Sequence, residues 1–300
     1  MRVFVTGATG FIGSAVVPEL LQNGHTVLGL ARSDSAARSL LAAGAQVQRG
    51  SLEDLESLRS GAAASDGVIH TAFIHDFSNY AASAATDERA ILALGETLSG
   101  SDRPLVVTSG TLLLRRQGAL ASEEDDFAPG FPRRSGQAAR TFASKGVRVS
   151  ELRLPPSVHG DGDRGFVPAL IKVAREKGVS AFVGDGSNHW PAVDRLDAAV
   201  LYRLALEKGR AGASYHGVAD EGVPFREIAA VIGRRLGVPA VSQGPDKAAD
   251  HFGWLAHFVA VDCPASSART RKELGWQPKR PGLIADIDRP GYFEVAQTAH

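Results

Sequence analysis

The sequence predicts an α/β protein with a doubly wound parallel sheet and a smaller α+β domain toward its C-terminal end. Two observations indicate this class. β-rich runs alternate with amphipathic helical patterns through the first half of the chain, which is typical of a parallel sheet with helices on both faces. The first β-rich run also ends in three regularly spaced glycines that open an apolar helix. The 300 residues are enough to bury a large core.

The elements of the first half follow in order. Strands are expected at residues 3–6, 26–30, 45–48, 67–71, 104–109 and 147–154, and helices at residues 11–23, 35–43, 52–59, 80–99 and 133–144. Residues 111–132 indicate a long irregular loop, and loops of this length are usually functional or mobile. Its acidic run, residues 123–126, is more typical of a solvated face than of a ligand site. We expect the first domain to span residues 1–156.

The second domain, residues 157–300, has a looser pattern of Gly- and Asp-rich turns around amphipathic helices. Short strands are expected to return to the main sheet and to a small second one. Because ligands of doubly wound sheets lie at the strand ends, we expect this half to act mainly as a substrate-binding lid. Helices are expected at residues 166–177, 196–208, 225–236, 248–258 and 266–274, and strands at residues 215–218 and 238–241.

The glycines after the first strand predict a binding site. Gly7 permits a tight turn, Gly10 lets the backbone approach a phosphate, and Gly13 lets the next helix pack closely on the sheet. The free N–H groups and the positive dipole end of that helix attract an anion. A strand before the motif and a helix after it are the context of a Rossmann dinucleotide site. We expect a pyrophosphate at Gly7, Ala8, Thr9, Gly10, Phe11, Ile12 and Gly13.

The overall composition excludes several function classes. The 33 basic residues balance 33 acidic ones, so no global charge attracts nucleic acid or an anionic membrane. The single cysteine, Cys263, excludes an internal disulfide, and the nine histidines are scattered, so no metal site is predicted. We see no targeting leader and no apolar run long enough to cross a bilayer. The expectation is a cytoplasmic protein that acts on a small molecule.

Three further motifs join the glycine motif: residues 67–72 with the sequence Gly-Val-Ile-His-Thr-Ala, residues 152–160, and residues 266–278. Together the four resemble the extended short-chain dehydrogenase/reductase superfamily, which includes NAD(P)-dependent sugar epimerases and dehydratases. The resemblance covers nearly the whole chain. It implies a second group of residues beside the ribose and nicotinamide, namely His70, Thr71, Ala72, Pro155, Pro156 and Ser157.

The chain departs from the catalytic signature of that superfamily. In these relatives a tyrosine transfers a proton, and a lysine four residues later on the same helix face lowers its pKa. Here the residues four places after the tyrosines are Ala84, Leu206, Ala219 and Ala296, so the pair is absent and the chain resembles an atypical member. Counting along the expected helix places Pro129 or Gly130 near the tyrosine position and Arg133 or Arg134 near the lysine position.

Other residues must then supply the acid. Ser109 matches the position of the family's catalytic serine or threonine, where it would bond a substrate carbonyl or merely satisfy a strand end. A histidine can donate a proton near neutral pH, and so can a tyrosine whose pKa is lowered. The candidates are His75, Asp76, Tyr80 and His159.

The cofactor preference depends on the end of the second strand. Arg32 and Ser33 suit a 2′-phosphate and favour NADP(H). Asp34 keeps NAD(H) possible, because an acidic residue there accepts the ribose hydroxyls, unless it only caps the next helix.

The substrate pocket is harder to predict. Arg133 or Arg134 could orient a carboxylate or phosphate with its planar fork, or both could be solvated residues at the start of a helix. Two functions stay open: an NADP(H)-dependent oxidoreductase or epimerase-like enzyme for a small carbonyl or alcohol, and a catalytically silent NAD(P)-binding regulator or redox sensor. A homodimer paired through helices 80–99 and 133–144 and a monomer are both possible. Candidate substrate contacts are His75, Arg133, Phe166, Trp190 and Trp254.

Overall fold

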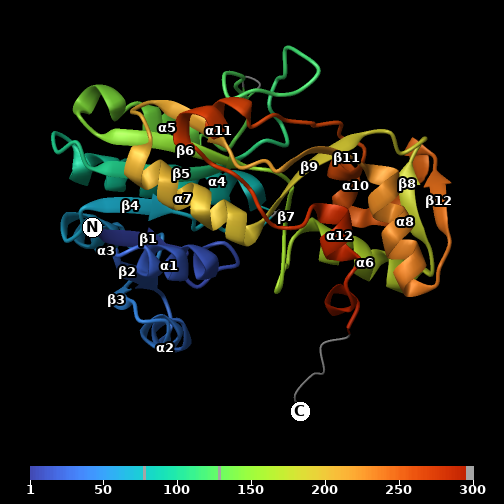
Figure 1. The fold of residues 1–300 in the computed structure, drawn as a ribbon, viewed down its shortest axis with the longest axis horizontal. Coiled ribbons are helices and arrows are strands. Elements are labelled where there is room, and N and C mark those ends of the chain that lie inside the picture. Colours follow the sequence, from blue (N-terminus) through green and yellow to red (C-terminus); the bar gives the residue numbers. More distant parts are fainter. Residues whose placement is uncertain (77–78, 128–129, 295–300) are drawn as a thin grey trace.

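The computed structural model describes residues 1–76, 79–127 and 130–294, and its larger part is built on a seven-stranded parallel sheet (Figure 1). The strand order is β10-β6-β5-β4-β1-β2-β3, so the order reverses between β1 and β4 as in doubly wound sheets. The predicted α/β fold is confirmed. The strands are β1 (Arg2–Thr6), β2 (Thr26–Ala31), β3 (Gln46–Arg49), β4 (Gly67–His70), β5 (Pro104–Gly110), β6 (Arg148–Leu154) and β10 (Ala213–His216).

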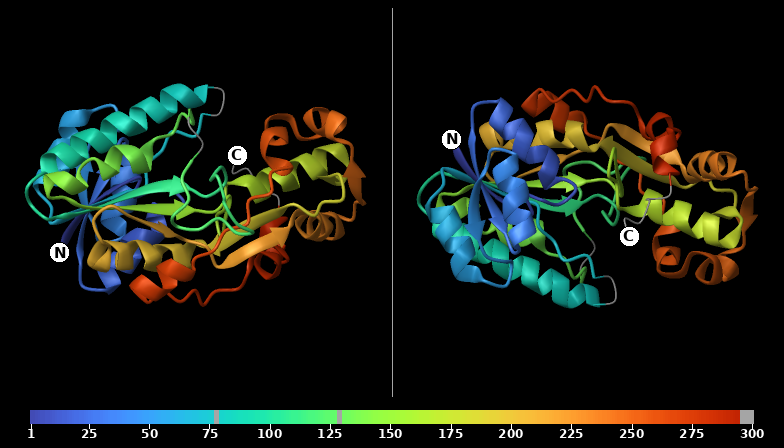
Figure 2. Two further views of the ribbon diagram at one scale, coloured as in Figure 1. Left: turned by 90° about the horizontal axis from the view of Figure 1, so that it is seen from above. Right: turned by 90° about the horizontal axis from the view of Figure 1, so that it is seen from below.

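Helices cover both faces of this sheet because alternate strand residues point to opposite sides. Val3 and Val5 belong to one buried cluster, whereas Phe4 belongs to the cluster on the other face. Figure 2 shows α4 and α5 on one face and α7 and α11 on the other. The helices are α1 (Gly13–Gln22), α2 (Asp34–Ala42), α3 (Leu55–Ala63), α4 (Tyr80–Leu98), α5 (Ser135–Arg140), α7 (Arg195–Lys208) and α11 (Ala268–Leu274).

The C-terminal part forms a second lobe, to the right in Figure 1. It holds a three-stranded sheet in the order β11-β9-β7 and a two-stranded sheet of β12 and β8. Trp190 and Phe225 are fully buried in its core. The elements are β7 (Ser157–His159), β8 (Ser180–Val183), β9 (His189–Asp194), β11 (Asp220–Pro224), β12 (Ala240–Gln243), α6 (Phe166–Lys177), α8 (Phe225–Leu236), α9 (Ala248–Phe252), α10 (Ala256–Val259) and α12 (Leu283–Ile287).

Two predicted helices differ from the structure. The helix expected at residues 133–144 is reduced to α5, followed by a 3-10 turn at Ala143–Lys145. The helix expected at residues 248–258 is broken at Gly253, whose φ of +57° ends α9 before α10 begins. A glycine with positive φ is a usual helix terminator, and the apolar spacing hid the break.

The acidic run at residues 123–126 is only in part the solvated face that the sequence suggested, since Glu124 and Asp126 are exposed. Glu123 and Asp125 are buried, at 6% and 5% exposure. The Glu123 carboxylate accepts hydrogen bonds from the amide and hydroxyl of Thr270, at 2.8 and 2.7 Å. The run also helps to line a polar hollow of about 210 Å³ with Arg140, Arg153 and Arg269. The run therefore ties the loop after β5 to α11.

Within the described residues, no helix is both long and apolar enough to cross a membrane.

Candidate cofactor and active site

The glycine turn between β1 and α1 has the shape of a phosphate cradle. Gly7 has a φ of +68°, and a Cβ on Gly13 would lie 2.1 Å from the Gly7 carbonyl oxygen, so neither position accepts a side chain. Thr9 and Gly10 are exposed. Among the described residues, no hydrogen-bond acceptor faces the amides of Phe11 and Ile12. These features fit the pyrophosphate of a dinucleotide.

Arg195, at the start of α7, lies beside this turn. Its guanidinium carbon is 5.3 Å from the centre of the Phe11 ring. A cation so placed can reach a phosphate bound at the turn. The contact joins residues far apart in the sequence, so no local pattern predicts it.

The end of β2 carries the residues expected to choose between cofactors. Arg32 is exposed there. Ser33, not Asp34, caps α2, because its hydroxyl accepts a hydrogen bond from the Ala36 amide at 3.2 Å. Asp34 is the first residue of the helix and forms an ion pair with Arg49 at 2.6 Å.

His70 is a buried structural link and does not present its ring to a cofactor. Its Nε2 bonds Asp87 at 3.1 Å, and its Nδ1 bonds the Thr6 hydroxyl at 2.8 Å. Because the ionised Asp87 can only accept a hydrogen bond, Nε2 carries the ring proton and donates to it. Nδ1 is then unprotonated and accepts a hydrogen bond from the Thr6 hydroxyl. Thr71 donates its hydroxyl to the Thr6 carbonyl at 2.8 Å, and the Ala72 backbone packs against Gly7. These contacts fix β4 against the glycine turn.

Asp87, on α4, organises a buried cluster at the carboxyl ends of β4 and β5. Its second oxygen accepts a hydrogen bond from the Ser135 hydroxyl at 2.5 Å and lies 3.8 Å from the Arg133 Nε. Burial raises the pKa of Asp87, but the His70 hydrogen bond and the charge of Arg133 outweigh it and hold that pKa below its ordinary value. Asp87 is therefore an anion that holds Arg133 in place. We call this group, with Tyr80, the Asp87 cluster.

Tyr80 begins α4 and lies against Arg133. Burial raises the pKa of the Tyr80 phenol, while the charge of Arg133 and its hydrogen bond to the phenol oppose that rise. The Phe73 ring is 5.8 Å from Tyr80 and 4.0 Å from the Arg133 guanidinium carbon. His75 packs edge-on against Phe73 at 5.3 Å, and partial burial and the charge of Arg133 lower its pKa. The structure thus brings together three of the predicted site residues, Tyr80, His75 and Arg133.

The sequence suggested that the Arg133 guanidinium could bind a substrate anion, but in the structure it is bound by protein groups. Its Nε donates to the Ser135 hydroxyl at 2.9 Å, and its Nη2 donates to the Thr108 carbonyl at 2.7 Å. The Tyr80 phenol takes a further hydrogen bond. Arg133 lies before α5 and not on it, since Arg134 is the residue that precedes the first turn of the helix. Gly130 lies outside the helix as well, and Pro129 lies outside the described residues.

Ser109 is committed to a second buried carboxylate. It is 4% exposed, and its hydroxyl donates to Glu151 at 2.6 Å. Glu151 also binds Arg153 and Arg140, both at 2.9 Å, and accepts from Ser214 at 3.0 Å. Burial raises the pKa of Glu151, but the charge of Arg153, the Ser109 hydrogen bond and the charge of Arg140 outweigh burial and hold that pKa below its ordinary value. Glu151 is therefore ionised. We call this the Glu151 cluster. The structure places Ser109 in the role of satisfying a buried group.

Thr111, one residue past β5, is the hydroxyl that the sequence analysis missed. It is 1% exposed, and its hydroxyl has no partner among the described residues. Its amide donates to the Leu154 carbonyl at 2.9 Å, which places it beside Pro155 and Pro156. Three hydroxyls occur in a row of four residues after Val107, and only the strand geometry shows which one is unused.

The segment expected beside the nicotinamide leads into β7. Pro155 is buried, Pro156 is partly exposed, and the Ser157 hydroxyl is buried without a partner in the described chain. His159 is fully buried and bonds Asp286 at 2.9 Å through Nδ1. It therefore belongs to the second lobe and does not join Tyr80.

His159 also lies near Asp194, and the candidate ligand atoms of His159, Asp194 and Asp286 are within 4.8 Å of one another. The sequence spacing could not show this group. Its carboxylates already have protein partners: Asp194 accepts from the Leu196 amide at 2.7 Å, and Asp286 pairs with Arg289.

The predicted aromatic substrate contacts form one cluster in the second lobe. Trp190 has no exposed surface, so it is core and not a pocket wall. Phe166 packs on Trp190 at 5.4 Å and on Trp254 at 5.8 Å. Trp254 is 46% exposed. Only Phe166 and Trp254 therefore reach the surface.

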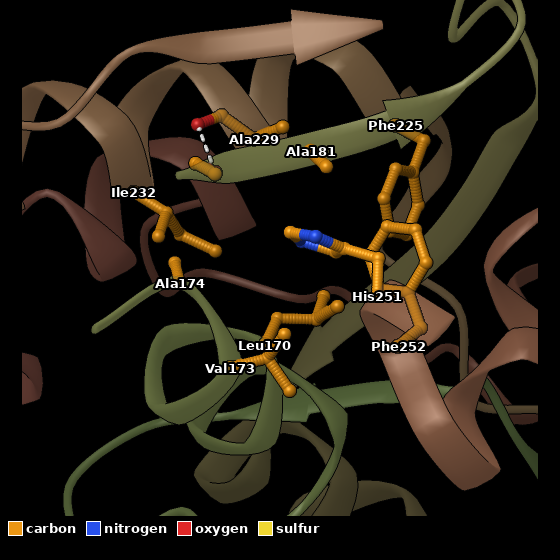
Figure 3. Close-up of a pocket in the computed structure, with 10 residues that line it drawn as sticks. Leu170, Val173, Ala174, Ala181, Phe225, Ala229, Ile232, His251 and Phe252 are labelled. Atoms are coloured by element: carbon orange, nitrogen blue, oxygen red, sulfur yellow. Dashed lines mark hydrogen bonds between the residues drawn. The ribbon is translucent and has the colours of Figure 1, made fainter. Parts of the chain in front are cut away.

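A small apolar cavity lies in the same lobe, between α6, β8, α8 and α9. Figure 3 shows the His251 ring pointing into it, with Phe225 and Phe252 nearby. Its volume of about 10 Å³ is near the minimum for one water molecule, so it is a packing void and not a substrate site. Burial and the nearby Lys177 lower the pKa of His251.

Comparisons with known proteins identify the family of the chain. Residues 3–98 match the NAD dependent epimerase/dehydratase family. An uncharacterized protein of Schizosaccharomyces pombe is 52% identical and covers 98% of the chain and 100% of its own length. The 2-alkyl-3-oxoalkanoate reductase of Stenotrophomonas maltophilia is 30% identical over 81% of the chain and 78% of that enzyme.

Among solved structures, the UDP-glucose 4-epimerase of Thermotoga maritima has the same fold, with a TM-score of 0.77 at 22% identity. The alignment covers 98% of both chains.

Proposed function

Because the chain belongs to the NAD dependent epimerase/dehydratase family of the extended short-chain dehydrogenase/reductase superfamily, we propose that it reduces a small carbonyl compound with NADP(H). The bound dinucleotide supplies a hydride. NADP(H) is preferred over NAD(H) because Arg32 is exposed at the end of β2, and Asp34, which would accept ribose hydroxyls, is paired with Arg49.

One observation carries this proposal: a phenol and a guanidinium meet at the carboxyl end of the parallel sheet, where ligands of this fold lie. Burial raises the pKa of Tyr80, so that pKa is not lowered as the sequence analysis required. The phenol is nevertheless protonated at neutral pH, and the charge of Arg133 acts in the direction that makes it a better proton donor. The Thr111 hydroxyl, which has no partner among the described residues, is a second candidate to polarise a substrate oxygen.

The rings around Tyr80 favour an apolar substrate. Phe131 lies 6.2 Å from Tyr80 and stacks on Phe127 at 5.1 Å, so one wall beside the phenol is aromatic. The 30% identical relative is named for a 3-oxoalkanoate, which is also a carbonyl compound with an alkyl chain. We therefore expect apolar ketones or aldehydes to be better substrates than sugar nucleotides.

The test has two stages. Titration calorimetry with NADPH and NADH measures binding, and loss of NADPH absorbance with a panel of apolar ketones, aldehydes and sugar nucleotides measures turnover. We expect NADPH to bind more tightly than NADH and an apolar carbonyl to oxidise it. If neither nucleotide binds at millimolar concentration, the proposal is wrong. If NADPH binds but no panel member reacts, the silent regulator becomes the better explanation.

A further inference from the structure

Helix α5 leaves no room for a side chain at Gly136, on the face that packs against β6. Its buried residues are Ser135, Gly136, Ala138 and Ala139, all small. A Cβ built on Gly136 would lie 2.2 Å from the Glu151 carboxylate, so even alanine there requires a shift. At Gly136 the helix is too close to β6 for an inward phenol or ammonium. The one large cation that α5 directs inward among the described residues, Arg140, is bound to Glu151, so a cation that serves an acid at this site comes from another segment.

Arg133 is held rigidly in a place where it can do this. One anchor is the Ser135 hydroxyl, at the start of α5, and the other is the Thr108 carbonyl, at the end of β5. Only 15% of its side chain is exposed. The Phe73 ring covers one face of the guanidinium at 4.0 Å. An arginine fixed on three sides keeps its charge at one position, and Tyr80 occupies part of its remaining hydrogen-bonding capacity.

We propose that Arg133 is the positioning residue for Tyr80, and that its fixed charge stabilises the phenolate that remains after Tyr80 gives its proton to the substrate. The acid then comes from α4 and the cation from the segment before α5. This inference rests on the proposed carbonyl reduction and deepens it.

The proton balance is simple. The bond between the Tyr80 oxygen and its hydrogen breaks, and a new O–H bond forms on the substrate oxygen while the carbonyl carbon takes the hydride. The phenolate later regains a proton from solvent. Of the titratable groups in the described part of the chain, Asp87 opposes phenolate formation, and His75 is neutral at neutral pH because its pKa is lowered. Asp87 acts mainly on Arg133, since His70 and Ser135 occupy both of its oxygens.

The experiment follows the phenol directly. Tyrosine labelled with carbon-13 at Cζ gives one NMR signal for each of the four tyrosines, and Tyr80→Phe assigns the signal of Tyr80. We expect Arg133→Gln to raise the titration midpoint of Tyr80 by about one pH unit or more, because an adjacent opposite charge usually shifts a pKa by about that amount. Arg133→Lys should restore most of the difference.

Arg134→Gln is the matched control, because it removes one positive charge from the neighbouring, exposed residue. It should leave the Tyr80 midpoint nearly unchanged. A Tyr80 midpoint that is the same in Arg133→Gln and wild type overturns the proposal. If Arg133→Gln does not fold, the titration of the wild-type protein alone tests the proposal. The Tyr80 signal must then titrate at a lower pH than the signals of Tyr202 and Tyr292, whose pKa values are strongly raised. Titration together with them also overturns it.

Activity gives a second readout. Once a substrate is known, Arg133→Gln should lower kcat by at least about tenfold and move the alkaline limb of the pH profile upward. The NMR titration needs no substrate and no cofactor. Failure to find turnover therefore counts against the proposed function, whereas an unchanged phenol midpoint counts against the role of Arg133.

Discussion

The Asp87 and Glu151 clusters are built from similar residues but differ in the role we assign to them. Each centres on a buried carboxylate whose pKa is lowered by an arginine, and each takes a hydroxyl from β5 or the start of α5. In the Glu151 cluster the carboxylate oxygens are shared among four protein partners. In the Asp87 cluster the arginine also interacts with a titratable phenol, Tyr80. This difference indicates that a buried ion pair can serve catalysis when one of its members also interacts with a titratable group.

Tyr80→Phe is the strongest test of this difference. The ring and its packing remain, but the acid is lost, so kcat should fall by about 10²–10⁴-fold, the usual contribution of general acid catalysis. Ser109→Ala, in the other cluster, should change kcat by less than about threefold, because its hydroxyl already serves Glu151. Steady-state kinetics with NADPH measures both. The reverse ranking would return the catalytic role to Ser109.

Glu151→Ala should break the structural cluster. It leaves Arg153, which is 1% exposed, without its nearest counter-charge, and removing one partner of a buried pair usually costs about 3–5 kcal/mol. We expect a loss of about 3 kcal/mol in the free energy of unfolding, measured by urea denaturation. Glu151→Gln keeps the shape and should cost less. A loss below about 1 kcal/mol would show that the cluster does not hold the sheet edge together.

Asp163 is a carboxylate for which the described residues provide no arginine partner, and it behaves in the opposite way. Burial raises its pKa from 3.8 to about 6. The folded state therefore binds more protons than the unfolded state between these values, so stability is greatest below the unfolded pKa and falls as pH rises through the folded pKa.

Asp163→Asn should therefore stabilise the protein at pH 7 by about 1 kcal/mol, a value reduced because the group is partly exposed, and should change little near pH 3.5. Urea unfolding at the two pH values checks this. Equal effects at both would mean that the Asp163 carboxyl is not the group whose titration changes the stability.

Local patterns were enough to predict the sheet and the glycine turn. Gly7, Gly10 and Gly13 act within one turn of the chain, and the strand and helix periods are visible in short windows. The break at Gly253 was not predicted, because a glycine inside an amphipathic pattern is often tolerated.

The site was only partly predictable. Tyr80, His75 and Arg133 were named as candidates, but their meeting depends on how α4 and the segment before α5 dock at the sheet. The sequence analysis named Ser109 and not Thr111, and the difference between them is a contact of Ser109 with Glu151, a residue on another strand. Such contacts join distant segments and leave no short-range signal.

The tight approach of α5 to β6 also limits protein engineering. A designer who placed a larger side chain at Gly136 would need to clear the space now taken by Glu151, and the vacancy would leave Arg153 without its nearest anion. Changes on this face of α5 therefore have to be paired with changes on β6, and variants intended to improve turnover are better directed at α4 and the loop after β5.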